Sequence, residues 1–146
     1  MIIIRQRPTL RWMYAGLVLT LLATAAPYVD RASGNLLADH IRAGYPTYTS
    51  ARVDTAVTLW LAILTVVGAL GVVGWLGTIW ATRAGKAWAR WAATALFVLG
   101  TLLALTALLA KDTSGETGLA PLLGWIGLLP SVAGAWVVAL CWRRTP

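Results

Sequence analysis

Four long apolar segments, separated by short polar stretches, dominate the hydrophobic pattern of this chain; they cover residues 12–29, 53–80, 88–110 and 119–142. The second has no charge between Asp54 and Arg83. As a helix, the 26 residues from Thr55 to Trp80 would form a rod of roughly 39 Å, enough to cross a hydrocarbon layer of about 30 Å with some tilt. The pattern predicts an all-α integral membrane protein, a single domain built as a four-transmembrane-helix bundle.

The polar stretches between these segments differ in length. Residues 30–52 form the largest, and within them Leu36, Leu37 and Ile41 share one side of a short amphipathic helix that Ser33 would cap and Gly44 would end. This helix is expected to lie on the membrane surface or to cap the bundle. Ser50 is expected to cap the second span.

The other two connections are short. Residues 81–87 form a basic link that Gly85 is expected to break, and residues 111–118 form a polar turn.

Charge is divided unequally between these connections. Residues 1–11, 81–90 and 143–146 hold eight of the twelve Lys and Arg residues and no acid, whereas residues 30–54 and 111–118 hold the other four with all five acids. The positive-inside rule therefore predicts that both termini are cytoplasmic and that the short amphipathic helix lies in the first extracytoplasmic loop. The net charge of +7 is then explained by topology and gives no reason to expect nucleic acid. Ala, Gly and Arg are frequent and Lys is rare, which is typical of a GC-rich bacterial genome. The protein is therefore expected in the cytoplasmic membrane of a bacterium.

The first apolar segment has a second interpretation. A basic start, an apolar middle and the sequence Ala23-Thr24-Ala25 are typical of a cleaved signal peptide covering residues 1–25. Pro27 close after that point, and the return to hydrophobic spans, favour retention.

Residues that carry chemistry are sparse. No ionisable residue lies between the ends of the four segments, the single Cys141 excludes an internal disulfide, and the single His40 lies in a loop. No nucleophile–base pair, phosphate-binding loop or metal-ligand cluster can be assembled, so neither an enzyme nor a metal or other cofactor is expected. Eight hydroxyl residues in the spans are expected to bond carbonyls of their own helices: Thr20, Thr24, Thr58, Thr65, Thr94, Thr101, Thr106 and Ser131.

Small residues recur in two of the segments. They are Gly68, Gly71, Gly74 and Gly77 in the second, with Gly124, Gly127, Ser131 and Gly134 in the fourth. Small residues let helix backbones approach closely in lipid. The two runs are expected to pack against each other, or else against a partner helix or a second copy. Pro130 removes a backbone hydrogen bond and is a candidate hinge in the fourth helix.

Two polar groups complete the candidates. One is an outer polar cluster of Asp39, His40, Arg42, Arg52 and Asp54. The other is a set of inner headgroup contacts, namely Arg83, Lys86, Trp88, Arg90 and Trp91, that would meet anionic membrane lipids.

The function expected from these features is non-enzymatic. The chain would act through helix–helix association, as an accessory or assembly subunit or as a homo-oligomer. The alternative is a small transporter or carrier for an apolar or lipid-like solute, with Pro130 as the hinge and the threonines lining a cavity.

Overall fold

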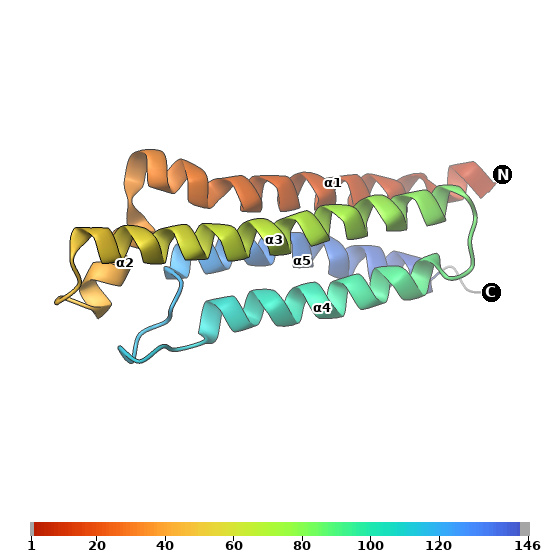
Figure 1. Cartoon of the computed structure of the whole chain (residues 1–146). Coiled ribbons are helices and arrows are strands. Elements are labelled where there is room, and N and C mark those ends of the chain that lie inside the picture. The colour runs from red at the N-terminus through yellow and green to blue at the C-terminus, as the bar shows by residue number, and fades with distance from the viewer. Residues whose placement is uncertain (1, 144–146) are drawn as a thin grey trace.

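The protein is a bundle of four long antiparallel helices with one short helix across an end (Figure 1). The structure is a computed structural model that describes the backbone of residues 2–143 and the side chains of residues 6–143. Four of its helices are long and apolar enough to cross a membrane, which confirms the four expected segments. The long helices are α1 (Ile2–Val29), α3 (Ser50–Arg83), α4 (Ala89–Leu109) and α5 (Pro121–Trp142).

The helices differ from the apolar segments mainly at their ends, because hydropathy marks the lipid-facing middle of a helix and not its caps. α1 begins ten residues before residue 12, since Arg and Gln side chains do not interrupt a helix. The cap of α3 was misassigned: Thr49, not Ser50, accepts the backbone N–H of Arg52, at 3.2 Å. α3 ends at Arg83, just before Gly85, whose φ of +67° confirms the expected break.

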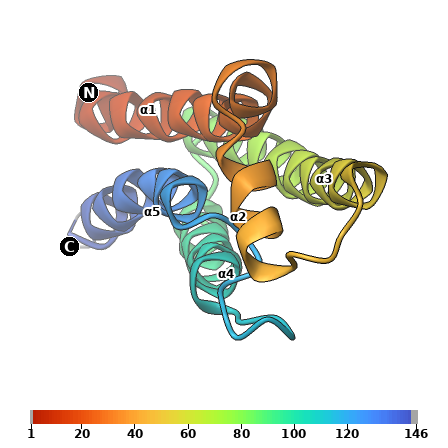
Figure 2. The same cartoon turned by 90° about the vertical axis from the view of Figure 1, so that its left-hand side faces the viewer.

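α1 and α5 pack along each other, and α1 also packs along α3, while α4 packs chiefly on α5. The α3–α4 contact is lighter, and the backbones of α3 and α5 hardly approach each other, although their side chains share two cores. Seen from the end of the bundle, α3 and α5 lie at separate corners with α1 and α4 between them (Figure 2). This arrangement decides which helix each glycine can meet.

The expected short helix is present as α2 (Leu36–Gly44), which follows a single π-helical turn, η1 (Asp30–Gly34), at the end of α1. Ser33 does not cap it; its hydroxyl donates to the carbonyl of Val29. The cap is Asp30, a buried carboxylate that accepts the backbone N–H groups of Leu36 at 2.7 Å and Leu37 at 3.1 Å.

α2 closes one end of the bundle. At about 1.5 Å per residue, the 34 residues of α3 span roughly 51 Å, against roughly 32 Å for the 21 residues of α4, so α3 projects well past its neighbour. Leu37 and Ile41 bury the apolar side of α2 against that projection, in a core shared with residues from α3 and the start of α5: Val53, Val57, Leu61, Leu119, Ala120 and Leu123.

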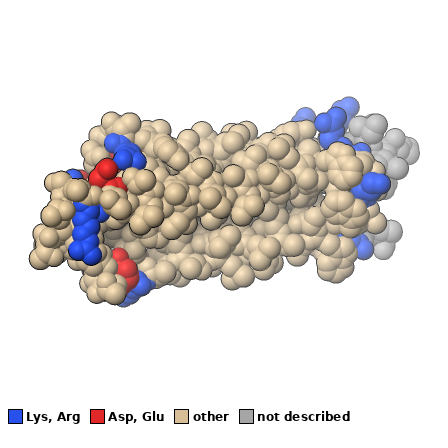
Figure 3. All heavy atoms as spheres, in the orientation of Figure 1, with Lys and Arg blue, Asp and Glu red and all other residues tan. Residues whose placement is uncertain are grey.

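We call this end of the bundle the α2 end, and the opposite end, with the α3–α4 connection, the link end. All five acids lie at the α2 end, while the link end carries only basic side chains among the charged residues described (Figure 3). Arg144 and the side chain of Arg5 are outside the described residues. The connections that the sequence analysis found rich in acids and those that it found purely basic therefore lie at opposite ends of the bundle.

Candidate functional site

The glycines of α3 face two different helices. An added Cβ at Gly68 would meet the Thr24 hydroxyl of α1 at 2.0 Å, and one at Gly71 would meet the Thr20 methyl at 3.1 Å. Gly74 faces α4 instead, where its Cβ would meet Leu96 Cδ1 at 2.6 Å. These three glycines therefore pack against other helices of the same chain and do not face a partner.

A further close approach in the α1–α3 contact is one that the sequence analysis missed. A Cβ at Gly16 would meet the six-membered ring of Trp75 at 2.3 Å, so the indole lies directly on the α1 backbone. Trp75 is 4% exposed and its Nε1–H donates to Thr20 Oγ1 at 3.0 Å. Thr20 in turn donates to the Gly16 carbonyl at 2.8 Å. The three residues lock α1 to α3 near mid-bundle.

The interpretation that the α3 glycines pack against the small residues of α5 is wrong. Gly124 of α5 faces Leu108 of α4, with a Cβ distance of 2.7 Å, and Gly134 faces Phe97 of α4 at 3.1 Å. The physical reason is the diagonal placement of α3 and α5. Ser131 is partly buried in α5, and α5 continues as a helix through Pro130, the candidate hinge.

Gly77 of α3 and Gly127 of α5 differ from the other small residues, because nothing lies within 4 Å of a Cβ added at either. Gly100 of α4 is open in the same way. Gly77 is also exposed, and it belongs to a row of exposed residues along α3 whose spacing alternates between four and three residues. This outward row is Leu59, Ile63, Val66, Leu70, Val73, Gly77 and Trp80. Its members lie on the face of α3 opposite the packed one.

The expected outer polar cluster is divided into separate contacts at the α2 end. Arg42 pairs with Asp39 at 3.0 Å, and Asp54 pairs with Arg31, which the sequence analysis did not single out, also at 3.0 Å. Arg52 lies over the ring of Tyr48, 4.2 Å from its centre. These groups are largely exposed, so each pair contributes at most about 1 kcal/mol.

His40 and Tyr45 fasten α2 to the connection between α4 and α5. A ring nitrogen of His40 is hydrogen-bonded to the Thr117 carbonyl, and the Tyr45 hydroxyl to that of Thr113 at 2.6 Å. In the same turn the hydroxyl of Ser114 donates to the Asp112 carboxylate, which lowers the pKa of Asp112 below its ordinary value of 3.8. These hydrogen bonds hold α2 against the connection between α4 and α5.

The expected headgroup contacts lie together at the link end. Arg83, Lys86, Trp88 and Trp91 are exposed there, in the places where basic and aromatic residues meet a membrane surface. Arg90 differs from them. Its guanidinium packs against the rings of Trp91 and Trp142, 5.9 and 4.9 Å from their centres, and these two rings are themselves in edge-to-face contact, with centres 4.8 Å apart. Its Nε is buried with no hydrogen-bond partner among the described residues.

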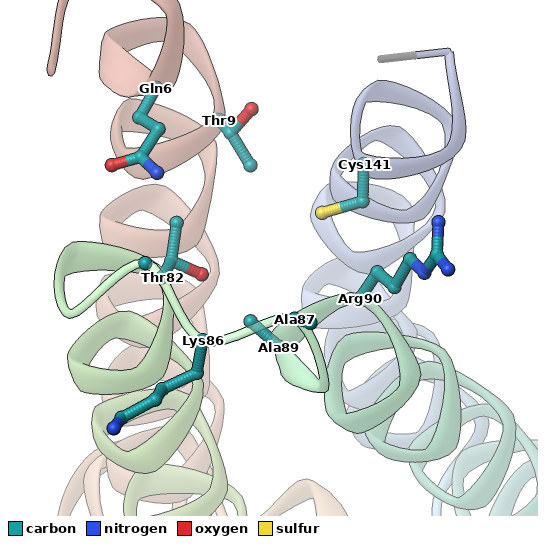
Figure 4. Close-up of a pocket in the computed structure, with 9 residues that line it drawn as sticks. Gln6, Thr9, Thr82, Lys86, Ala87, Ala89, Arg90 and Cys141 are labelled. Carbon is teal, nitrogen blue, oxygen red and sulfur yellow. The ribbon is translucent and has the colours of Figure 1, made fainter. Parts of the chain in front are cut away.

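A pocket of about 250 Å³ opens beside Arg90 at the link end, where all four long helices meet (Figure 4). The Thr9 hydroxyl, from α1, is buried beside this space and has no hydrogen-bond partner among the described residues. The close-up shows Thr9, Thr82 and Cys141 turned toward the gap between α1 and α5. The remaining lining residues are Gln6, Gly85, Lys86, Ala87 and Ala89.

The hydroxyls in the spans mostly follow expectation. Thr20, Thr24, Thr65 and Thr94 each donate to the carbonyl four residues earlier, and so do Thr58 and Thr106. Thr101 does not: its buried hydroxyl has no partner among the described side chains and backbone. Within residues 6–143 no three His, Cys, Asp or Glu side chains gather as metal ligands would.

Comparison with known proteins adds no relative: no family model, curated protein or solved structure matches this chain. The fold itself defines the class. Four apolar helices of membrane-crossing length indicate an integral membrane protein.

Proposed function

We propose that this protein acts in the membrane by helix–helix association, and that it docks another transmembrane helix on the outward row of α3. The docked helix would come from a second copy or from a protein that the chain accompanies as an accessory or assembly subunit. No step of this function requires a catalytic group or a cofactor.

The observation that carries the proposal is Gly77 in the outward row. A glycine inside a helix costs about 1 kcal/mol relative to alanine, and lipid tails gain nothing from its missing side chain. In this row it has open space above it, with Val73 67% exposed on one side and Trp80 58% exposed on the other. The alternating spacing of four and three residues is the one that meshes with a second helix at a shallow crossing angle.

The proposal includes an orientation and a location. With every acid at the α2 end and only basic charges described at the link end, the positive-inside rule favours a link end in the cytoplasm and α2 outside. Both termini would then be cytoplasmic, in the plasma membrane of a bacterium. Cysteine accessibility tests this: a cysteine at Ser114 should react with an impermeant maleimide added to intact cells, and one at Ala84 only after the cells are opened. The reverse pattern would invert the bundle.

Association is tested by changing Gly77 to Leu. Because the site is open, the monomer should fold unchanged, while the added side chain holds another helix away. Gly100→Leu is the matched control, since it makes the same change at an open glycine on α4. We expect chemical cross-linking in native membranes to give a defined complex for the wild type and for Gly100→Leu, and to lose it for Gly77→Leu. Equal cross-linking of all three proteins would refute the docking face.

A carrier for an apolar or lipid-like solute is the second candidate, favoured by the pocket between the helices at the link end. A transport route would also have to pass mid-bundle, where Trp75 lies on Gly16 and Thr24 on Gly68. This close packing favours association over carriage. A Pro130→Ala variant separates the two, because only a hinged carrier would lose solute flux in proteoliposomes.

A further inference from the structure

We infer that lipid chains cover this bundle only between two levels, marked by Trp80 and Trp60 of α3, and that the α2 end lies in water beyond the lipid headgroups. The inference concerns the depth of the protein in the membrane. It does not depend on which helix docks on the outward row of α3, or on which side of the membrane α2 lies.

The exposed surface of α3 changes from polar to apolar once along the helix. The exposed residues among positions 50–58 are polar or alanine, and they include Arg52 and Asp54. From Leu59 to Trp80 every exposed residue is apolar or glycine. Because charged side chains are costly in the hydrocarbon layer, the lipid-covered part of α3 begins near Leu59, several residues after the start of the apolar run in the sequence.

The buried residues at the α2 end form a core of the kind found in water. Beneath a surface that carries Asp39 and Arg42, the buried side chains are aliphatic; they include Leu37, Ile41, Val53 and Val57. Burial of apolar groups drives folding in water, whereas lipid supplies no such drive, so this core indicates that water surrounds the α2 end. Val53 and Val57 lengthen the apolar run of the sequence because they face this core, and not because they face lipid.

The contact between α1 and α3 places two tryptophans close to one level near the link end. Trp75 contacts Gly16, which sets the register of the two helices. Because the helices are antiparallel, Trp80, five residues beyond Trp75, lies within one residue of the level of Trp12.

The contact between Gly74 and Leu96 gives the same result for α4. Counted from it, Trp80 lies within one residue of the level of Trp91. Trp91 in turn touches Trp142 of α5 edge to face, with ring centres 4.8 Å apart. All four long helices therefore carry a tryptophan near this level, and tryptophan is enriched where a membrane meets water.

The opposite boundary follows from the thickness of the membrane. A hydrocarbon layer of about 30 Å corresponds to about 20 residues of a helix that crosses it. Counted from Trp80, that distance ends at Trp60 on α3; counted from Trp91, it ends at Lys111, just after α4. Between these levels α3 and α4 carry no charged residue, and the visible face of the bundle carries its charges only near the two ends (Figure 3).

The α2 end reaches further than the headgroups do. Ten residues of α3, numbers 50–59, precede Trp60, and at about 1.5 Å per residue they extend about 15 Å. Headgroups occupy only about 5–8 Å on each side of the hydrocarbon layer. Therefore α2, which packs along these residues, lies in water together with the exposed carboxylates of Asp39 and Asp54.

Site-directed spin labelling measures this depth. Single cysteines are introduced by Thr55→Cys, Val66→Cys, Leu70→Cys and Leu99→Cys in a Cys141→Ser background, and each full-length protein is labelled and reconstituted in vesicles of phosphatidylethanolamine and phosphatidylglycerol. The four positions are exposed, so the labels should leave the helix packing unchanged. At each label the access of oxygen, which concentrates in hydrocarbon, is compared with the access of a water-soluble nickel chelate.

We expect the ratio of oxygen access to chelate access to be highest for Leu70→Cys, because Leu70 lies halfway between Trp60 and Trp80. Leu99→Cys is the matched control on α4: the register of α3 and α4 places Leu99 within one residue of the same level, so its ratio should be the same. The label of Thr55→Cys should be as accessible to the chelate as a label in water.

A membrane that covered all of residues 53–80 would be centred near Val66. The highest ratio would then move by four residues to Val66→Cys, and the label of Thr55→Cys would be shielded from the chelate; either result would overturn the inference. A helix docked on the outward row hinders oxygen and chelate alike, so it leaves the ratio unchanged. The test is therefore separate from that of helix association.

Discussion

Replacing Gly16 by alanine tests the packing of α1 on α3 with a single methyl group. The new Cβ would lie 2.3, 2.5 and 2.7 Å from three atoms of the Trp75 ring, where ordinary contacts begin near 3.4 Å, so the ring must move by about 1 Å. It has little freedom to move, because it is 4% exposed and its Nε1–H is bonded to Thr20. Overpacking of this kind costs about 1–3 kcal/mol, and loss of the hydrogen bond adds about 0.5–1.5 kcal/mol.

The expected loss for Gly16→Ala is therefore about 2–4 kcal/mol in the free energy of unfolding. Reversible unfolding in mixed micelles of increasing SDS content measures it. Gly100→Ala is the control: its Cβ meets open space, so the same chemical change should be neutral or stabilise by up to about 1 kcal/mol. In a Trp75→Leu background the obstructing ring is gone, and Gly16→Ala should cost much less. A wild-type midpoint for Gly16→Ala, or no coupling to Trp75, would refute this account of the contact.

Three smaller predictions concern the connections. Asp30→Ala should weaken the cap of α2 by about 0.5–2 kcal/mol and speed hydrogen exchange of the α2 amides, whereas Asp39→Ala, which removes only an exposed ion pair, should not. Because the pKa of Asp112 is lowered in the folded protein, its hydrogen bond to Ser114 stabilises the turn above about pH 3.8, and this stabilisation is lost as the pH falls through the lower folded pKa. The chemical shift of the Ser114 amide should change over that pH range, and Asp112→Asn should abolish the change. Gly85→Ala places a side chain at φ +67° and should lower the free energy of unfolding by about 1 kcal/mol. Ala84→Gly is the control, because it leaves the backbone turn at Gly85 unstrained.

The elements of this fold could be predicted from the sequence because each leaves a local signal. Long uncharged runs mark the four helices, the spacing of Leu37 and Ile41 marks α2, and Gly85 marks a helix end. These signals depend on residues close together in the chain. Helix ends were predicted less well, since Thr49 and Asp30 act through hydrogen bonds that hydropathy does not record.

The pairing of helix faces could not be predicted, because helices that are apolar all round present no polar face to separate lipid from protein. Gly68 and Gly124 lie at close approaches between helices, but their neighbours are Thr24 and Leu108, not each other. Nothing in the sequence around Gly16 indicates a close approach, because the residue that packs on it, Trp75, is far away in the chain. The pocket beside Arg90 likewise depends on four helices meeting at one end of the bundle.

The account as a whole depends on whether the outward row of α3 contacts another helix. The most direct measurement is native mass spectrometry of the wild type, Gly77→Leu and Gly100→Leu, each released gently from its own membrane. We predict a defined multimer, or a stoichiometric second membrane protein, for the wild type and Gly100→Leu, and a folded monomer for Gly77→Leu. A wild-type protein that leaves the membrane as a monomer without any companion protein would contradict the proposal.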